Sequence, residues 1–213
     1  MTSYAQYERG AICDSFLRLG PDAPTLDDPW LARHLAAHLV IRDSRPDLFA
    51  GQVVRPLRGR LDEAVDDLAR TDFVTLVDRV RSGPPAWSPA RVRRVDEVVN
   101  GGEFFIHHED LLRGAPGFER RPLDVEHERF LWDLIKRGSR LYFRNVPAGV
   151  VLVAEGHGRQ AAKKPTENGT VVLRGRPGEL VLYASGRSRV AHVEVDGPPE
   201  AVAEIEAARL GLS

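Results

Sequence analysis

Apolar residues recur with a helical period through the first two thirds of the chain. We expect the second predicted helix to be capped by Asp27 or Asp28, with Pro29 in its first turn. The third is expected to be broken near Thr71, which can cap the new start before Asp72. Asp124 is expected to cap the last long helix. The predicted helices are Tyr4–Leu19, 27–43, 57–81, from 89 or 90 to Leu112, and 124–143. Short loops between them favour a four-helix bundle with one extra or broken element.

After Pro147 the pattern changes to short β-branched runs separated by glycines, which is typical of strands. The expected strands are Val150–Val153, Thr170–Leu173, Glu179–Tyr183 and Val190–Val195. Pro198 and Pro199 then open a final amphipathic helix. The sequence therefore predicts a mixed fold, with a helical domain over residues 1–146 and a small α+β domain over residues 147–213.

Composition narrows the class of protein. The chain has 213 residues, 42% hydrophobic and 29% charged, and a formal net charge of -1. Such a balance gives no overall field for recruiting nucleic acid or an anionic membrane. The longest apolar runs are shorter than a bilayer span, and the N-terminus lacks the pattern of a signal peptide. We therefore expect a cytoplasmic protein with neither a nucleic-acid nor a membrane partner.

Three residues point to metal chemistry. Glu103 and His107 are four apart in a predicted helix, so both side chains lie on one face. His38 lies beside the apolar stripe of another predicted helix. Two imidazole nitrogens and one carboxylate are the ligand set of a catalytic-type zinc site, which keeps an open position for water or substrate.

Other interpretations of these residues remain open. Glu103 follows Val95 and Val99 at helical spacing, so it is expected to face the core, where an unpartnered carboxylate is costly. A divalent cation would neutralise it, and so would an ion pair with an arginine. His34 and His38 also form an i,i+4 pair that can act as a metal clamp.

The remaining polar residues carry weaker signals. Asp110, one turn beyond His107, is either a carboxylate that orients a ligand or a surface acid. His127 is expected to be solvated. Cys13, the only cysteine, has no neighbour that would lower its thiol pKa, and no Ser-His-Asp motif is present.

Two motifs resemble those of the mycothiol-dependent maleylpyruvate isomerase family. The first is Asp27-Asp28-Pro29-Trp30 followed by 35–43, and the second is Glu103-Phe104-Phe105-Ile106-His107-His108-Glu109-Asp110. The pattern is most similar to an actinobacterial subgroup of this family. The resemblance implies a DinB-like four-helix bundle that carries zinc, followed by a smaller domain similar to sterol carrier proteins. It also implies that His38, Glu103 and His107 are the metal ligands.

The segment from Gly178 to Arg187 resembles the C-terminal pattern of the family, in which an arginine faces the site. Arg187 is therefore a catalytic candidate that binds thiol or substrate, and Arg42 is a second candidate for binding a carboxylate. This chain has His34 where the family commonly has aspartate, which offers a competing ligand.

The resemblance implies a function as well. Zinc or another divalent metal would hold a low-molecular-weight thiol, mycothiol in this family, and lower its pKa. The thiol would add to a small electrophilic substrate, and would then leave in an isomerase or stay attached in a transferase. A non-catalytic metal- or ligand-binding module and a hydrolase using zinc-bound water are the alternatives. We expect a monomer or a homodimer.

Overall fold

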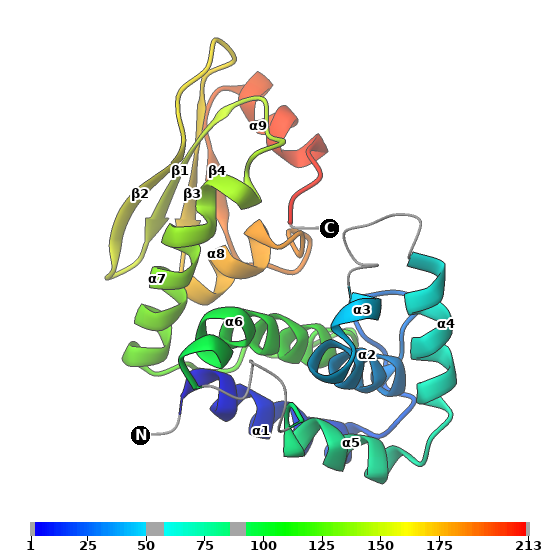
Figure 1. Cartoon of the computed structure of the whole chain (residues 1–213). Coiled ribbons are helices and arrows are strands. Elements are labelled where there is room, and N and C mark those ends of the chain that lie inside the picture. The colour runs from blue at the N-terminus through cyan, green and yellow to red at the C-terminus, as the bar shows by residue number, and fades with distance from the viewer. Residues whose placement is uncertain (1–2, 50–57, 86–92, 212–213) are drawn as a thin grey trace. The chain divides into compact units, whose positions relative to one another are not determined.

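The computed structural model describes residues 3–49, 58–85 and 93–211, without the side chains of residues 46, 49 and 93–99. Contacts within the chain divide it into two compact units, with the boundary between Arg120 and Arg121. Figure 1 shows a helical first unit and a second unit built around a sheet. The mixed fold class predicted from the sequence is confirmed.

The first unit consists of helices. Their order along the chain is α1 (Tyr4–Leu19), α2 (Ala32–Ser44), α3 (Pro46–Phe49), α4 (Arg58–Ala69), α5 (Phe73–Ser82) and α6 (Arg93–Leu112). Helix α1 packs along α6 and α5, and α2 packs against α4 and α5. The expected start of α6 near residue 89 and the start of α4 at residue 57 lie outside the described residues.

Local signals in the sequence explain several helix ends. The Ser3 hydroxyl and the Gln6 side chain form a reciprocal capping box at the start of α1, and Gly20, with φ of 86°, ends it. The predicted break in the third helix is confirmed, but the cap is Asp72, whose carboxylate accepts the Thr75 N–H, and not Thr71.

Helix α2 begins later than predicted. Its first residue is Ala32, so neither Asp27 nor Asp28 caps it. Instead Nδ1 of His34 accepts the Leu31 N–H at 3.1 Å, which satisfies one donor at the start of the helix. The His34 side chain therefore takes part in the start of the helix, and the Asp27 side chain does not.

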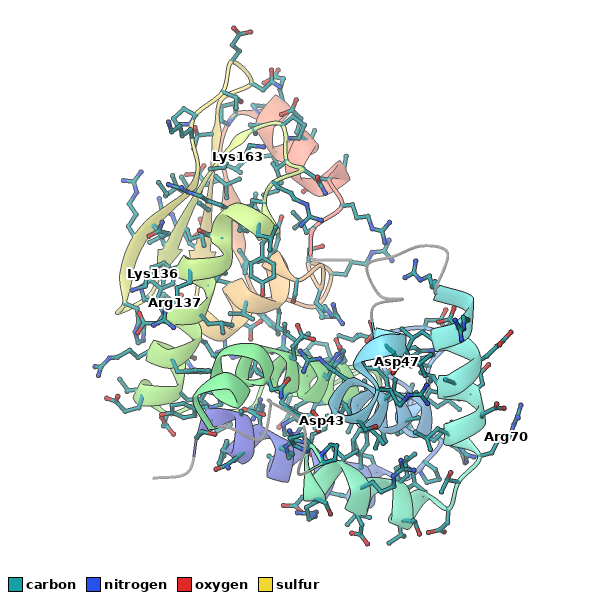
Figure 2. The ribbon with its side chains drawn as sticks, in the orientation of Figure 1. Asp43, Asp47, Arg70, Lys136, Arg137 and Lys163 are labelled. Atoms are coloured by element: carbon teal, nitrogen blue, oxygen red, sulfur yellow. The ribbon has the colours of Figure 1, made fainter. Side chains whose placement is uncertain are left out.

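The core of the first unit gathers the inward faces of its helices. Ile12 and Phe16 of α1, Leu35 of α2 and Leu76 of α5 are completely buried. Arg9 of α1 reaches through this packing to Asp43 of α2, the carbonyl of Val80 and the ring of Phe104. Asp43 is labelled in Figure 2.

The second unit contains a four-stranded sheet with helices packed on it. Its elements are α7 (Val125–Tyr142), β1 (Gly149–Ala154), β2 (Gly158–Lys163), β3 (Thr170–Gly175), α8 (Pro177–Ala184), β4 (Glu194–Asp196) and α9 (Pro199–Ala207). The strand order is β2-β1-β3-β4, with β1 and β3 parallel and the outer pairs antiparallel. Lys163, labelled in Figure 2, donates to the carbonyls of Arg144 and Val146.

Helix α7 belongs with this sheet by its contacts. Asp124 caps it as predicted, accepting the His127 N–H at 2.8 Å. The helix packs on α8 and β2 and buries Leu131 and Ile135. The contact boundary therefore precedes α7, whereas the sequence pattern puts the domain boundary near residue 147, where the strands begin.

One predicted strand is wrong and one strand was missed. Residues Glu179–Tyr183 lie in α8, because Pro177 starts a helix there and every residue of that helix is buried, which removes the amphipathic period. Strand β2 is polar and half exposed at the sheet edge, so it has no apolar run to reveal it. Of the predicted strand Val190–Val195, only the end forms β4.

Within the described residues, no helix is both long and apolar enough to cross a bilayer.

Candidate metal centre

His38 occupies a buried position on α2. Its side chain is in the core, with 1% of the residue exposed. The imidazole packs against the Trp30 ring, at 5.1 Å between centroids, and against the His107 ring, at 5.2 Å. The α2 histidine therefore meets the α6 histidine directly, as the metal-site hypothesis requires.

Glu103 and His107 lie one turn apart on α6. The Oε2 atom of Glu103 is 3.8 Å from Nε2 of His107. The Glu103 side chain is 26% exposed, whereas the His107 side chain is 7% exposed. The side chains of Val95 and Val99, expected on the same face, lie outside the described residues. The structure thus brings His38, Glu103 and His107 together, with solvent access on the side of the carboxylate.

Arg42 also reaches Glu103. Its Nε atom lies 3.6 Å from Oε2 of Glu103, and its Nη1 donates to the side-chain oxygen of Asn100. Arg42 follows His38 by one turn of α2, so the guanidinium beside Glu103 and the imidazole beside His107 come from the same helix. The arginine ion pair considered as an alternative is therefore present, and it shares the carboxylate with His107.

Two further carboxylates face the other ring nitrogen of His107. Oδ2 of Asp110 lies 3.0 Å from Nδ1, and Oδ2 of Asp27 lies 3.8 Å from it. Ligand atoms of Asp27, His107 and Asp110 all lie within 4.8 Å of one another, so among the described residues this is the group whose spacing suits a cation, and it shares His107 with the predicted ligands. His107 belongs to both groups, one at each nitrogen.

The neighbouring His108 joins a buried network between α6 and α1. Its Nε2 lies 2.9 Å from the Ser15 hydroxyl, and its Nδ1 lies 2.9 Å from Oε2 of Glu8. This is the connectivity of a Ser-His-acid triad, which the sequence did not reveal. Ser15, however, is inside α1, where backbone N–H groups bond within the helix and cannot stabilise an oxyanion. The network therefore joins the two helices.

Cys13 is unsuited to nucleophilic chemistry. It is completely buried on α1, and its Sγ lies 3.7 Å from the carbonyl oxygen of Val77. Burial raises the pKa of the thiol to about 11, against the lowering effect of Arg81 and Arg9. Any thiol chemistry at the centre therefore needs a thiol from outside the chain.

Three other residues singled out in the sequence make contacts of their own. Nδ1 of His34 accepts the Leu31 N–H at the start of α2. Arg187 belongs to the second unit, in the turn after α8, where its Nη1 donates to the Ser185 carbonyl at 2.8 Å. His127, expected to be solvated, is buried with 1% of the residue exposed.

Sequence reasoning missed Asp27, Trp30 and Asn100 as neighbours of the centre. A signal for the first two was available, because both lie in the Asp-Asp-Pro-Trp motif that carried the family resemblance. Asp27 had been assigned to helix capping, which also explains an aspartate before a helix. Nothing in the sequence pointed to Asn100 as a neighbour of the centre, because an asparagine one turn before a glutamate is common in helices.

The residue types at the centre are those that bind zinc. The His38 ring lies against the His107 ring, and Nε2 of His107 lies 3.8 Å from Oε2 of Glu103. Two imidazoles and a carboxylate are the ligand set of a zinc centre that keeps an open position. Glu103 also faces Arg42, so a bound ion would share this carboxylate with the guanidinium.

Comparison with solved structures finds two matches. One is the crystal structure of the mycothiol-dependent maleylpyruvate isomerase, with a TM-score of 0.57, 17% identity, and coverage of 92% of this chain and 96% of that one. The other is a histidine-to-alanine mutant of that isomerase, with the same TM-score and coverage and 16% identity. At such identities the likeness establishes the fold. No family model matches the sequence, and neither does any curated protein.

Proposed function

We propose that this protein binds a divalent metal, zinc, through His38, Glu103 and His107, and uses mycothiol to isomerise, or to transfer a thiol to, a small electrophilic substrate. The observation that carries the proposal is the meeting of these residues in a fold shared with a mycothiol-dependent isomerase. The helical part is then a DinB-like four-helix bundle, and the sheet is a sterol-carrier-like domain.

A bound zinc ion would lower the pKa of a coordinated thiol, so that a thiolate is available at neutral pH. The chain itself offers no such group, because Cys13 is buried with a raised pKa. This supports an external thiol as the nucleophile. The thiolate would add to one carbon of an activated double bond, whose π electrons would move to the activating group. Rotation about the resulting single bond, followed by expulsion of the thiolate as the double bond re-forms, would give the isomer.

We propose that Arg42 binds an anionic group of the substrate. This is supported by its guanidinium, which lies beside Glu103 and donates to the side-chain oxygen of Asn100. A guanidinium binds a carboxylate with two parallel hydrogen bonds. We propose the same role for Arg187, which rests on the motif from Gly178 onward.

The proposal is tested with cobalt in place of zinc. Cobalt-loaded protein is titrated with mycothiol, and thiolate binding at the metal is followed by its charge-transfer absorption. The Cys13→Ala variant serves as the control, because it removes the chain's own sulfur. We expect the absorption to appear in the wild type and in Cys13→Ala, and to be absent in His38→Ala.

A cobalt spectrum that does not respond to thiol would support a structural metal or a hydrolase. Hydrolysis of an activated ester without added thiol would then favour the zinc-water reaction. An absorption that disappears in Cys13→Ala would overturn the proposal, because the thiolate would then come from the protein.

A further inference from the structure

The two nitrogens of His107 face different surroundings. Nδ1 faces Oδ2 of Asp110 at 3.0 Å and Oδ2 of Asp27 at 3.8 Å. Nε2 faces Oε2 of Glu103 at 3.8 Å. A neutral imidazole has one N–H donor and one lone pair, so the neighbours decide which nitrogen is free to bind a metal.

Asp110 is built into this position. Its side chain is completely buried, and its place three residues after His107 in α6 brings its carboxylate to the ring. The carbonyl of Asp110 accepts the Leu26 N–H at 3.0 Å, which ties the segment preceding Asp27 to the end of the same helix. Gly114 permits this close approach, because a Cβ there would come within 2.2 Å of the Pro24 carbonyl oxygen.

An ionised carboxylate only accepts hydrogen bonds. When Asp110 is ionised and His107 is neutral, the 3.0 Å contact requires the hydrogen on Nδ1, which leaves the lone pair on Nε2. We infer that Asp110, with Asp27 behind it, is a positioning residue that fixes the Nδ1–H tautomer of His107 and so presents Nε2 towards Glu103. The inferred tautomer does not depend on the proposed metal site. Its expected consequence, tighter metal binding, does rest on that site.

The competing arrangement is a cation bound by Asp27, His107 and Asp110 themselves, through Nδ1. One nitrogen and two carboxylates favour a harder cation than zinc, and His38 would contribute no ligand to that group. The ligand group at Nε2 uses both histidines and the exposed carboxylate. We therefore infer that Asp110 does not bind the metal itself but orients His107, as carboxylates commonly do for metal-binding histidines.

The tautomer is measured on metal-free protein. Long-range ¹H–¹⁵N correlation spectra of histidine-labelled protein, at a pH where the ring is neutral, show which nitrogen of His107 carries hydrogen. We expect Nδ1–H in the wild type. In Asp110→Asn the amide can donate to Nδ1, and we expect a shift towards Nε2–H. A wild-type Nε2–H ring would overturn the inference.

Zinc affinity gives the second readout. We expect Asp110→Asn and Asp110→Ala to bind zinc about 10- to 100-fold more weakly than the wild type. The matched control is Glu109→Gln, which removes an equally buried carboxylate of α6 whose partner is Arg113. This control is expected to keep wild-type affinity, and far-UV circular dichroism reports whether each variant is folded.

The outcomes separate this inference from the proposed function. Wild-type affinity in Asp110→Asn would overturn the inference while leaving the metal site intact. Loss of zinc in the Asp110 variants without loss in His38→Ala would also overturn it, because Asp110 would then be a ligand. If the wild type binds no zinc but shows the Nδ1–H ring, the inference stands and the proposed function fails.

Discussion

The ion pair between Arg9 and Asp43 gives the sharpest test of how the helical unit is held together. The two side chains are each 7% exposed and join α1 to α2. The Arg9 guanidinium also donates to the Val80 carbonyl of α5 and lies 4.3 Å above the Phe104 ring of α6. Replacing Asp43 with alanine removes this carboxylate from the buried cation.

We expect Asp43→Ala to lower the free energy of unfolding by about 3–5 kcal/mol, the range for removing one partner of a buried pair. That is a large part of the roughly 5–15 kcal/mol that stabilises a domain. The double variant Arg9→Met, Asp43→Leu fills the same space with apolar groups, and we expect most of the loss to be recovered. The size of the recovery measures the cost of burying the Arg9 charge without Asp43.

Urea unfolding followed by circular dichroism measures these differences. The control is Asp14→Ala, which breaks the Arg81–Asp14 pair, whose side chains are 41% and 75% exposed. We expect about 1 kcal/mol or less from that exposed pair. If Asp43→Ala costs no more than Asp14→Ala, or if the double variant is less stable than Asp43→Ala, the reasoning is refuted.

Three further predictions follow from other groups. Burial raises the pKa of Glu128, against the lowering effect of its hydrogen bond from the Gly178 N–H. The folded state therefore holds a proton longer than the unfolded one, and stability falls as pH rises from about 4.5 through the folded pKa. Glu128→Gln keeps the hydrogen-bond acceptor and should gain stability relative to the wild type between pH 4 and 7 in urea titrations. If the stability gain of Glu128→Gln did not change with pH, burial of the ionised carboxylate would not be its cause. Gly114→Ala should destabilise by about 1–3 kcal/mol, because its Cβ would overlap the backbone of Pro24, whereas Gly10→Ala, with open space around it, should stabilise by up to about 1 kcal/mol. Equal thermal midpoints for the two variants would contradict the packing. Cys13 should react with iodoacetamide at pH 8 only after unfolding, as mass spectrometry can show, and rapid labelling of native protein would contradict its burial.

The helical part was predictable because its signals are local. The bounds of α1 follow from Ser3, Gln6 and Gly20, and the start of α7 follows from Asp124. The start of α2 was not predictable in this way, because an aspartate at position 27 looks the same whether it caps a helix or faces a histidine eighty residues away. Such a choice is made by tertiary contacts that the local pattern does not contain.

The same limit explains the second unit. Residues 179–183 are apolar on every side, so period alone cannot separate a buried helix from a buried strand. At the centre, helical spacing paired Glu103 with His107, and His38 was indicated both by its place beside an apolar stripe and by the family resemblance. The Ser15–His108–Glu8 network had no such signal, because its members come from two helices whose packing is known only from the structure.

Zinc content is the measurement that tests the account most directly. Elemental analysis would compare the wild type with His38→Ala and His107→Ala, and with His34→Ala as a control that removes the nearby histidine capping α2. We predict one zinc per chain in the wild type and in His34→Ala, and loss of zinc in the other two. Zinc that persists without His38 and His107, or a wild type that takes up none after zinc is supplied, would contradict it.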